Sequence, residues 1–209
     1  MSVSLNHSDA TQQFVLHGVS WDAYQQILEA LPEHRLRHSY DGWNLTMMSP
    51  SQEHDWIKGR IGRLIEATAT QLKLPIKSIG STTLRRSGVK KGLEPDEAFY
   101  VAHEAQVRGK KRLDPDGDPP PDLAIEVDIT NSSEDRQEIY AQLGVPEVWR
   151  YSDQRLIFWR LEADGYREVS QSIAFPFLES SYLSNLLKQA ESWDDTSLIA
   201  SHLDWLAAR

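Results

Sequence analysis

Three carboxylates alternate along an otherwise apolar segment of the chain: those of Asp122, Glu126 and Asp128. A β-strand has a period of two residues, so these acids would share one face of a strand. The opposite face would be apolar and would carry Leu123, Ile125, Val127 and Ile129. Carboxylates held side by side repel one another and lose hydration when they are covered. The segment therefore predicts a cation, or a helix that bears a positive group, facing these acids.

A helix with a positive group is predicted directly after this strand, over residues 133–143. Residues 131–133 are favourable N-cap types, and Gly144 is a favourable stop. Arg136 and Tyr140 are four residues apart, so they share one face of the helix. We expect the Arg136 guanidinium to lie within ion-pair distance of an acid of the preceding strand, with Tyr140 positioning it.

A further carboxylate, that of Asp96, follows Pro95 in a second strand-like segment, over residues 94–101. Asp96 and Glu126 would then lie on neighbouring strands at one end of a sheet. Two such carboxylates can hold Mg²⁺ or Mn²⁺ together with a strand carbonyl and water. The other interpretation is a pair of partly exposed structural acids. His54, at the start of a predicted long helix, either caps and packs there or contacts this acidic site.

The charge of the chain opposes nonspecific attraction to nucleic acid. There are 31 acidic and 22 basic residues, for a formal net charge of −9. Any contact with phosphates must therefore rest on a local basic surface. The connection over residues 102–121 carries such a cluster, in which Lys110, Lys111 and Arg112 are adjacent. The alternative interpretation of this run is a solvated loop.

Length and composition indicate one main domain. The 209 residues are 40% hydrophobic, which is enough for a core. We expect a flexible arm over residues 1–13, a domain over 14–178 and a helical extension over 179–209. The chain shows no membrane-length apolar run and no signal-peptide pattern. The absence of cysteine excludes disulfides and thiolate metal sites, and it fits a cytoplasmic protein.

The pattern of elements predicts an α/β fold with a mixed, strongly bent sheet. A helix over residues 52–72 would cover one side of the sheet and the 133–143 helix the other. Residues 76–86 are predicted to form one strand, and Asp41-Gly42 to form a two-residue hairpin turn. A β-meander follows, and two amphipathic helices end the chain. These C-terminal helices favour a homodimer, which is our expectation for the assembly.

Several motifs in fixed order resemble one family. They are Glu-Pro-Asp at 94–96, Pro-Pro-Asp-Leu-Ala-Ile-Glu-Val at 120–127, Tyr140 and Gly-Val-Pro-Glu-Val-Trp at 144–149, together with residues 42–51 and His54. The chain resembles the Uma-type putative restriction endonucleases of the PD-(D/E)XK nuclease superfamily. The resemblance implies a restriction-endonuclease-like core, a divalent metal on Asp96 and Glu126, and hydrolysis of a DNA phosphodiester.

Two positions depart from the pattern that this resemblance implies. The superfamily places a lysine where this chain has Asp128, and related sequences move the lysine to the position of Arg136. Arginine keeps the positive charge but cannot act as a general base at neutral pH. We therefore expect Asp96, Glu126 and Asp128 as metal ligands, with Arg136 as an electrostatic group.

Supporting residues and alternatives complete the prediction. Tyr140, His54 and Asp122 would support the site, although Asp122 is more readily structural, and Lys110, Lys111 and Arg112 would contact DNA. The cofactor would be Mg²⁺ or Mn²⁺ and the partner DNA, with no membrane association. The alternative function is a catalytically silent nuclease-fold protein that binds or regulates. A weaker alternative uses the carboxylates as general acid and base on another substrate.

Overall fold

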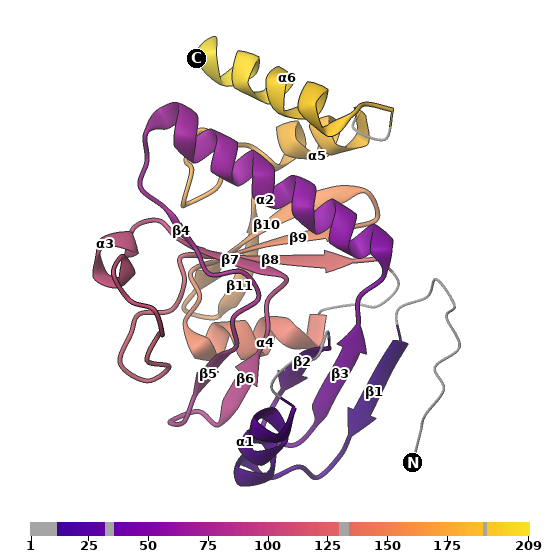
Figure 1. The fold of residues 1–209 in the computed structure, drawn as a ribbon, viewed down its shortest axis with the longest axis vertical. Helices are drawn as coiled ribbons and strands as arrows, with labels where there is room; N and C mark the ends of the chain where they lie inside the picture. The colour runs from indigo at the N-terminus through magenta and orange to yellow at the C-terminus, as the bar shows by residue number, and fades with distance from the viewer. Residues whose placement is uncertain (1–11, 32–35, 130–133, 190–191) are drawn as a thin grey trace.

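The computed structural model describes residues 12–31, 36–129, 134–189 and 192–209. Figure 1 shows a two-sheet α/β arrangement, in which helices lie on both sides of the larger sheet. The α/β class is therefore confirmed, but the described strands form two sheets rather than one. The expected arm over residues 1–13 lies almost entirely outside the described residues, and the first strand begins at Gln12.

The larger sheet contains six strands in the order β11-β10-β9-β8-β7-β4. Its strands are β4 (Lys77–Ser78), β7 (Glu97–Tyr100), β8 (Leu123–Asp128), β9 (Glu147–Ser152), β10 (Arg155–Glu162) and β11 (Gly165–Val169). The β8–β9 pair is parallel and the other pairs are antiparallel, so the sheet is mixed as expected. The predicted meander is confirmed as β9, β10 and β11.

The smaller sheet contains five antiparallel strands in the order β1-β3-β2-β6-β5. They are β1 (Gln12–Leu16), β2 (Arg37–Tyr40), β3 (Leu45–Ser49), β5 (Leu84–Arg86) and β6 (Lys91–Leu93). The predicted hairpin joins β2 to β3, but its loop covers residues 41–44. The Asp41 side chain accepts hydrogen bonds from the backbone N–H groups of Trp43 and Asn44, which holds this longer turn.

The predicted strand over residues 76–86 is wrong. The segment divides into β4, which pairs in the larger sheet, and β5, which pairs in the smaller one. Gly80 lies between them with a positive φ of 57°, a backbone conformation that glycine adopts readily and that redirects the chain. The connection after β7 likewise includes a short helix, α3 (Glu104–Val107).

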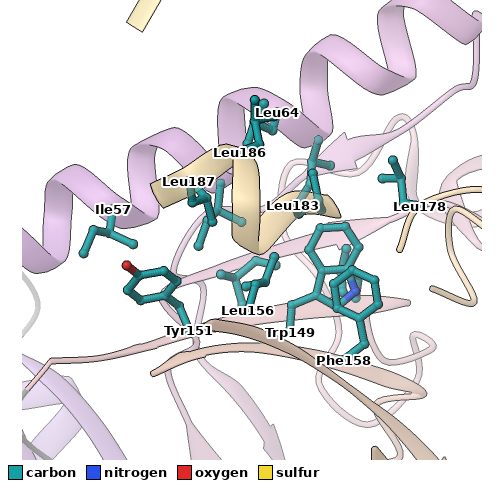
Figure 2. Packing of buried hydrophobic residues seen from close by; sticks show 14 of the residues in the cluster. Ile57, Leu64, Trp149, Tyr151, Leu156, Phe158, Leu178, Leu183, Leu186 and Leu187 are labelled. Carbon is teal, nitrogen blue, oxygen red and sulfur yellow. The ribbon is translucent and has the colours of Figure 1, made fainter. Parts of the chain in front are cut away.

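Helix α2 (Gln52–Leu72) covers one face of the larger sheet, and its bounds agree with the predicted 52–72 helix. The Ser51 side chain accepts a hydrogen bond from the His54 N–H and thereby caps the helix. Figure 2 shows the core that α2 and α5 (Ser180–Gln189) form with β9 and β10. It includes Ile57, Leu64, Trp149, Tyr151, Leu156, Phe158, Leu183, Leu186 and Leu187.

Helix α4 (Glu134–Leu143) lies on the opposite face of this sheet and connects the parallel strands β8 and β9 (Figure 1). The helix ends at Gly144, whose φ is 79°. The predicted cap residues 131–133 lie outside the described part of the chain. Since β8 alternates as expected, Leu123, Ile125 and Val127 join the core beneath α2. The face that carries Glu126 is turned toward α4.

The remaining helices are α1 (Trp21–Ala30) and α6 (Asp195–Ala207). Helix α6 packs on α2 of its own chain, where His202 contacts Thr68 at 2.7 Å between Nε2 and Oγ1. Within the described ranges, no helix combines the length and the apolar character needed to cross a membrane.

Candidate active site

Strand pairing brings Asp96 and Glu126 to neighbouring positions. Asp96 directly precedes β7, and Glu97 lies opposite Ile125 in the antiparallel β7–β8 pair. The Asp96 carboxylate also accepts a hydrogen bond of 2.8 Å from the Val127 N–H. The exposed fractions are 0% for Asp96 and 2% for Glu126, so both are buried. This burial rejects the interpretation as partly exposed acids, and it also shows that neither carboxylate opens widely to solvent.

Helix α4 supplies two donors to Glu126. Arg136 Nη1 lies 2.8 Å from Glu126 Oε2, and the Tyr140 hydroxyl donates to Glu126 Oε1. Arg136 Nη2 also donates to the backbone carbonyl of Glu94. The predicted approach of Arg136 to an acid of β8 is therefore confirmed. Tyr140 differs slightly from expectation, because its hydroxyl binds Glu126 rather than Arg136.

Asp96 has a histidine and an arginine as further neighbours. His54 Nε2, at the start of α2, lies 3.0 Å from Asp96 Oδ2, although its N–H direction is not aligned for a hydrogen bond. Arg37 Nε, from β2, lies 3.7 Å from Asp96 Oδ1. Asp96 Oδ1 itself is buried and accepts no hydrogen bond among the described residues. Of the two interpretations of His54, the contact with the acidic site is therefore observed, and the side chain is also buried in the packing at the start of α2.

The environment separates the pKa values of the two acids. Burial alone would raise the pKa of Asp96, but the contact with His54 and the charges of His54 and Arg136 outweigh it and hold this pKa below its ordinary value. Burial raises the pKa of Glu126 to about 8; Arg136 opposes this rise, whereas the charges of Asp96 and Asp128 add to it. Two nearby carboxylates in an enclosed site rarely both ionise. Asp96 is therefore the ionised member, and Glu126 exchanges its proton near neutral pH.

Asp128 lies farther along the same strand face and has a different partner. Its Oδ2 accepts a hydrogen bond of 2.6 Å from Arg150 Nε of β9. Among the described residues, no three His, Cys, Asp or Glu side chains are grouped so that they could hold a metal ion together. The structure therefore brings Asp96 and Glu126 together, whereas Asp128 is held in an ion pair beside them.

Asp122 lies at the other end of β8 and is a structural acid. It accepts hydrogen bonds from the backbone N–H groups of Val101 and His103, at 2.7 and 2.9 Å. Its Oδ1 lies 2.6 Å from Nδ1 of His103. These contacts fasten the turn after β7, so Asp122 does not join Asp96 and Glu126.

The smaller sheet adds a polar network that the sequence patterns did not indicate. The Tyr24 hydroxyl lies 2.9 Å from Nε2 of buried His38, and His38 Nδ1 lies 3.4 Å from Glu94 Oε1. Glu94 also contacts Arg37, at 4.0 Å, and Thr83, at 3.1 Å. The only part of this network that a sequence motif indicated was Glu94, in the Glu-Pro-Asp motif at residues 94–96. Nothing local links the hairpin residues to that motif, because β2 and β6 pair across about fifty positions of the chain.

The basic run over residues 110–112 contains one residue in an ion pair and two without a carboxylate partner among the described residues. Lys110 forms an ion pair with Asp118. Lys111 and Arg112 are exposed and have no carboxylate partner among the described residues. The run therefore offers two side chains, rather than three, with a charge available to phosphates.

Comparisons with known proteins agree with the fold. A crystal structure of a putative nuclease belonging to DUF820 from Anabaena variabilis ATCC 29413 has a TM-score of 0.54 and 13% identity, covering 88% of this chain and 99% of that chain. No curated protein matches the sequence. The restriction-endonuclease-like fold expected from the sequence is thus confirmed. Residues 21–194 match the model of the family described as Uma2, putative restriction endonuclease. The chain therefore belongs to the Uma2 family of putative restriction endonucleases.

Proposed function

We propose that this chain is a Mg²⁺- or Mn²⁺-dependent endonuclease that hydrolyses DNA phosphodiester bonds at Asp96 and Glu126. The observation that carries the proposal is the meeting of two buried carboxylates from adjacent strands, of which one oxygen, Asp96 Oδ1, has no hydrogen-bond donor among the described residues. A buried carboxylate oxygen without a donor is costly. A ligand at this position would remove that cost.

The donor chemistry fits a hard divalent cation. Carboxylate oxygens are the side-chain ligands that Mg²⁺ and Mn²⁺ prefer. Asp96 is held ionised by its cationic neighbours, and the raised pKa of Glu126 means that a cation would displace a proton from this carboxyl. When bound, such an ion polarises a phosphoryl oxygen and lowers the pKa of a bound water. Asp128 would act as an additional ligand only if it left Arg150.

The positive side chains would position the phosphate rather than transfer a proton. Arg136 is partly buried between Glu126 and the Glu94 carbonyl, and its guanidinium stays protonated. It would stabilise the negative charge that develops on the phosphate. His54 would hold the Asp96 carboxylate in place. Lys111 and Arg112 would contact the DNA backbone.

Plasmid nicking in the presence of Mn²⁺ tests this function. The parent chain is expected to convert supercoiled plasmid to the open-circular form, and a chelator should abolish the conversion. Asp96→Asn and Glu126→Gln should each reduce the rate by at least about 100-fold, since each removes a ligand of the ion that would stabilise the developing charge, and a lost stabilisation of this kind costs that much. Glu162→Gln, a partly exposed acid of β10 paired with Arg167, is the matched control. Equal nicking by all four proteins would contradict the proposal.

A second candidate is a nuclease-fold protein that binds or regulates without turnover. The observation that favours it is that both oxygens of Glu126 already have partners in the chain: one is in the ion pair with Arg136 and the other accepts the hydrogen bond from Tyr140. Arg136→Lys separates the two functions, because lysine is the residue that the resemblance implies at this position. If neither the parent nor this variant nicks plasmid, but both shift DNA in a gel, the binding function is favoured. The expected homodimer and the cytoplasmic location stay predictions.

A further inference from the structure

A cavity of about 540 Å³ lies at the other end of β8 from Glu126. Its walls come from β5, from residues 110–115, from the three prolines that precede β8 (residues 119–121), and from the chain just after α4. Glu126 lies four positions after Asp122, the residue that directly precedes β8, which corresponds to about 13 Å along an extended strand. Figure 1 shows α3 and its following loop on the opposite side of the view from the N-terminal end of α2, where His54 lies. The cavity is therefore distinct from the carboxylate site.

Positive charge predominates in the lining, which contains six basic residues and two acids. Arg85 and Arg86 are half-buried, yet neither forms an ion pair with a carboxylate among the described residues. Among the described residues, the Arg86 guanidinium makes one hydrogen bond, a long one of 3.4 Å to the backbone carbonyl of Asp118. Lys111 and Arg112, which are exposed and have no carboxylate partner among the described residues, also line the cavity. In a chain with a net charge of −9, this is an unusual concentration of available positive charge.

The acids near the cavity are already occupied. Asp118 pairs with Lys110 and accepts a hydrogen bond from the Asp114 N–H. Asp114 accepts one from the Asp116 N–H. Asp116, outside the lining, binds Ser87 through both carboxylate oxygens; these hydrogen bonds, and to a smaller degree the charges of Arg86 and Arg85, lower its pKa. The arginines thus retain capacity for an added anion.

The other walls of the cavity are apolar. They include the side chains of Leu84, Leu113, Leu143, Val145 and the three prolines, together with the ring of Tyr100. Thr82 and Thr83 add hydroxyl groups. A volume of this size is typical of small-ligand sites, which combine apolar walls with a few polar groups. Arginine binds phosphate through paired hydrogen bonds and also stacks on flat rings.

We propose that this cavity binds a nucleoside phosphate, with its phosphate on Arg85 and Arg86 and its base against the proline and leucine walls. Inorganic phosphate alone would leave the apolar walls in contact with water. A neutral nucleoside would leave the half-buried arginines without an anionic partner. A DNA duplex contacts surfaces rather than filling such a concavity. The proposal does not depend on the nuclease function.

Isothermal titration calorimetry with four nucleotides, the four corresponding nucleosides and inorganic phosphate tests the proposal. AMP, CMP, GMP and UMP are titrated into the full chain, and the matching nucleosides and inorganic phosphate serve as reference probes. At least one nucleotide should bind at least about tenfold more tightly than its nucleoside and than inorganic phosphate. Comparable affinity for nucleotide and inorganic phosphate would indicate an ion site only and would overturn the proposal, as would no nucleotide binding at millimolar concentration.

Two kinds of variant separate charge from shape. Arg85→Gln and Arg86→Gln should each weaken nucleotide binding about tenfold by removing a charge-assisted hydrogen bond. Thr82→Trp keeps every charge but fills the exposed mouth of the cavity, so it should also abolish binding. Arg160→Gln, an exposed arginine of β10, is the charge-matched control and should bind like the parent. Thermal unfolding of each variant confirms that it is folded.

Further measurements distinguish this site from the proposed nuclease site. Glu126→Gln should bind the nucleotide within about twofold of the parent, because neither Glu126 nor Asp96 lines the cavity. Nucleotide binding that persists in a chain that never nicks DNA would support the cavity and contradict only the nuclease. If Arg85→Gln weakens binding of duplex DNA and no nucleotide binds, the arginines belong to a DNA surface and the proposal is wrong.

Discussion

The two ends of β8 treat charge in opposite ways. Near its C-terminal end, the carboxylates of Asp96 and Glu126 are buried, and Arg136 and His54 lie against them. Near its N-terminal end, Arg85, Arg86, Lys111 and Arg112 line a cavity without carboxylate partners among the described residues. A buried charge is stable only when it is paired, whereas a charge that lines a solvent-accessible cavity stays hydrated until a ligand binds. One end is therefore largely neutralised from within, and the other retains its positive charge.

Of the two ends of β8, the acidic end should lose the most stability when its positively charged side chain, Arg136, is removed. Arg136→Ala leaves Glu126 without its ion pair, so the free energy of unfolding should fall by about 3–5 kcal/mol. The loss should be greater at pH 9 than at pH 6, because Glu126 can take up a proton at the lower pH. Urea unfolding followed by tryptophan fluorescence measures it. Arg136→Lys is the control and should lose much less; equal losses in both variants would mean that the charge is unimportant.

The pH dependence of the free energy of unfolding tests whether Glu126, at the acidic end of β8, is protonated in the folded chain. The folded chain holds the Glu126 proton up to a pKa of about 8, whereas an unfolded chain releases it near the ordinary value of 4.5. Unfolding between these pH values releases a proton, so this group makes the free energy of unfolding fall as pH rises. The slope is at most about 1.4 kcal/mol per pH unit. Urea titrations from pH 5 to 9 should show a flatter profile for Glu126→Gln, and an unchanged profile would contradict the raised pKa.

Substitution of Tyr140 tests how much the hydrogen bond from its neutral hydroxyl to Glu126 contributes to stability. Tyr140→Phe removes the hydroxyl that donates to Glu126 Oε1 without changing the ring. A buried acceptor that loses its donor costs about 1–3 kcal/mol, which chemical denaturation can measure. Tyr166→Phe, which removes a hydroxyl that donates to the Val145 carbonyl, is the control for loss of a hydrogen bond away from the acids. Only Tyr140→Phe should also change the pH profile.

The positive end is expected to show smaller effects, visible mainly in DNA binding. Lys111→Glu should weaken DNA affinity and reduce the slope of log affinity against log salt by about one, because one phosphate contact is lost. Lys110→Glu should affect the slope less, since Lys110 already pairs with Asp118. Fluorescence anisotropy at several salt concentrations checks both. If the slopes of the parent and the Lys111 variant agree, the run is a solvated loop.

Local periodicity predicted the acidic end better than the positive end. The alternation of β8 and the four-residue spacing of Arg136 and Tyr140 placed Glu126 correctly relative to α4. These elements are adjacent in sequence, so the short connection leaves few possible arrangements. The helix bounds of α2 followed from a serine cap and a regular apolar stripe, which are also local signals.

What the sequence did not indicate comes from long-range pairing. Arg37 and His38 reach the site because β2 pairs with β6, and Arg85 reaches the cavity because the chain passes from β4 of the larger sheet to β5 of the smaller one at Gly80. No period or motif encodes these distant partners. The ion pair of Asp128 with Arg150 was missed for the same reason, since Arg150 lies on β9 beyond the intervening helix.

Calorimetric titration of Mn²⁺ tests the central claim most directly, which is that Asp96 and Glu126 together hold a divalent cation. The parent should bind one ion at pH 7 and release a proton from Glu126, so the observed heat should vary with the ionisation enthalpy of the buffer. Asp96→Asn and Glu126→Gln should each weaken binding by at least about tenfold, while Glu162→Gln binds like the parent. Binding of equal affinity in all four proteins, or no binding by the parent, would contradict the claim.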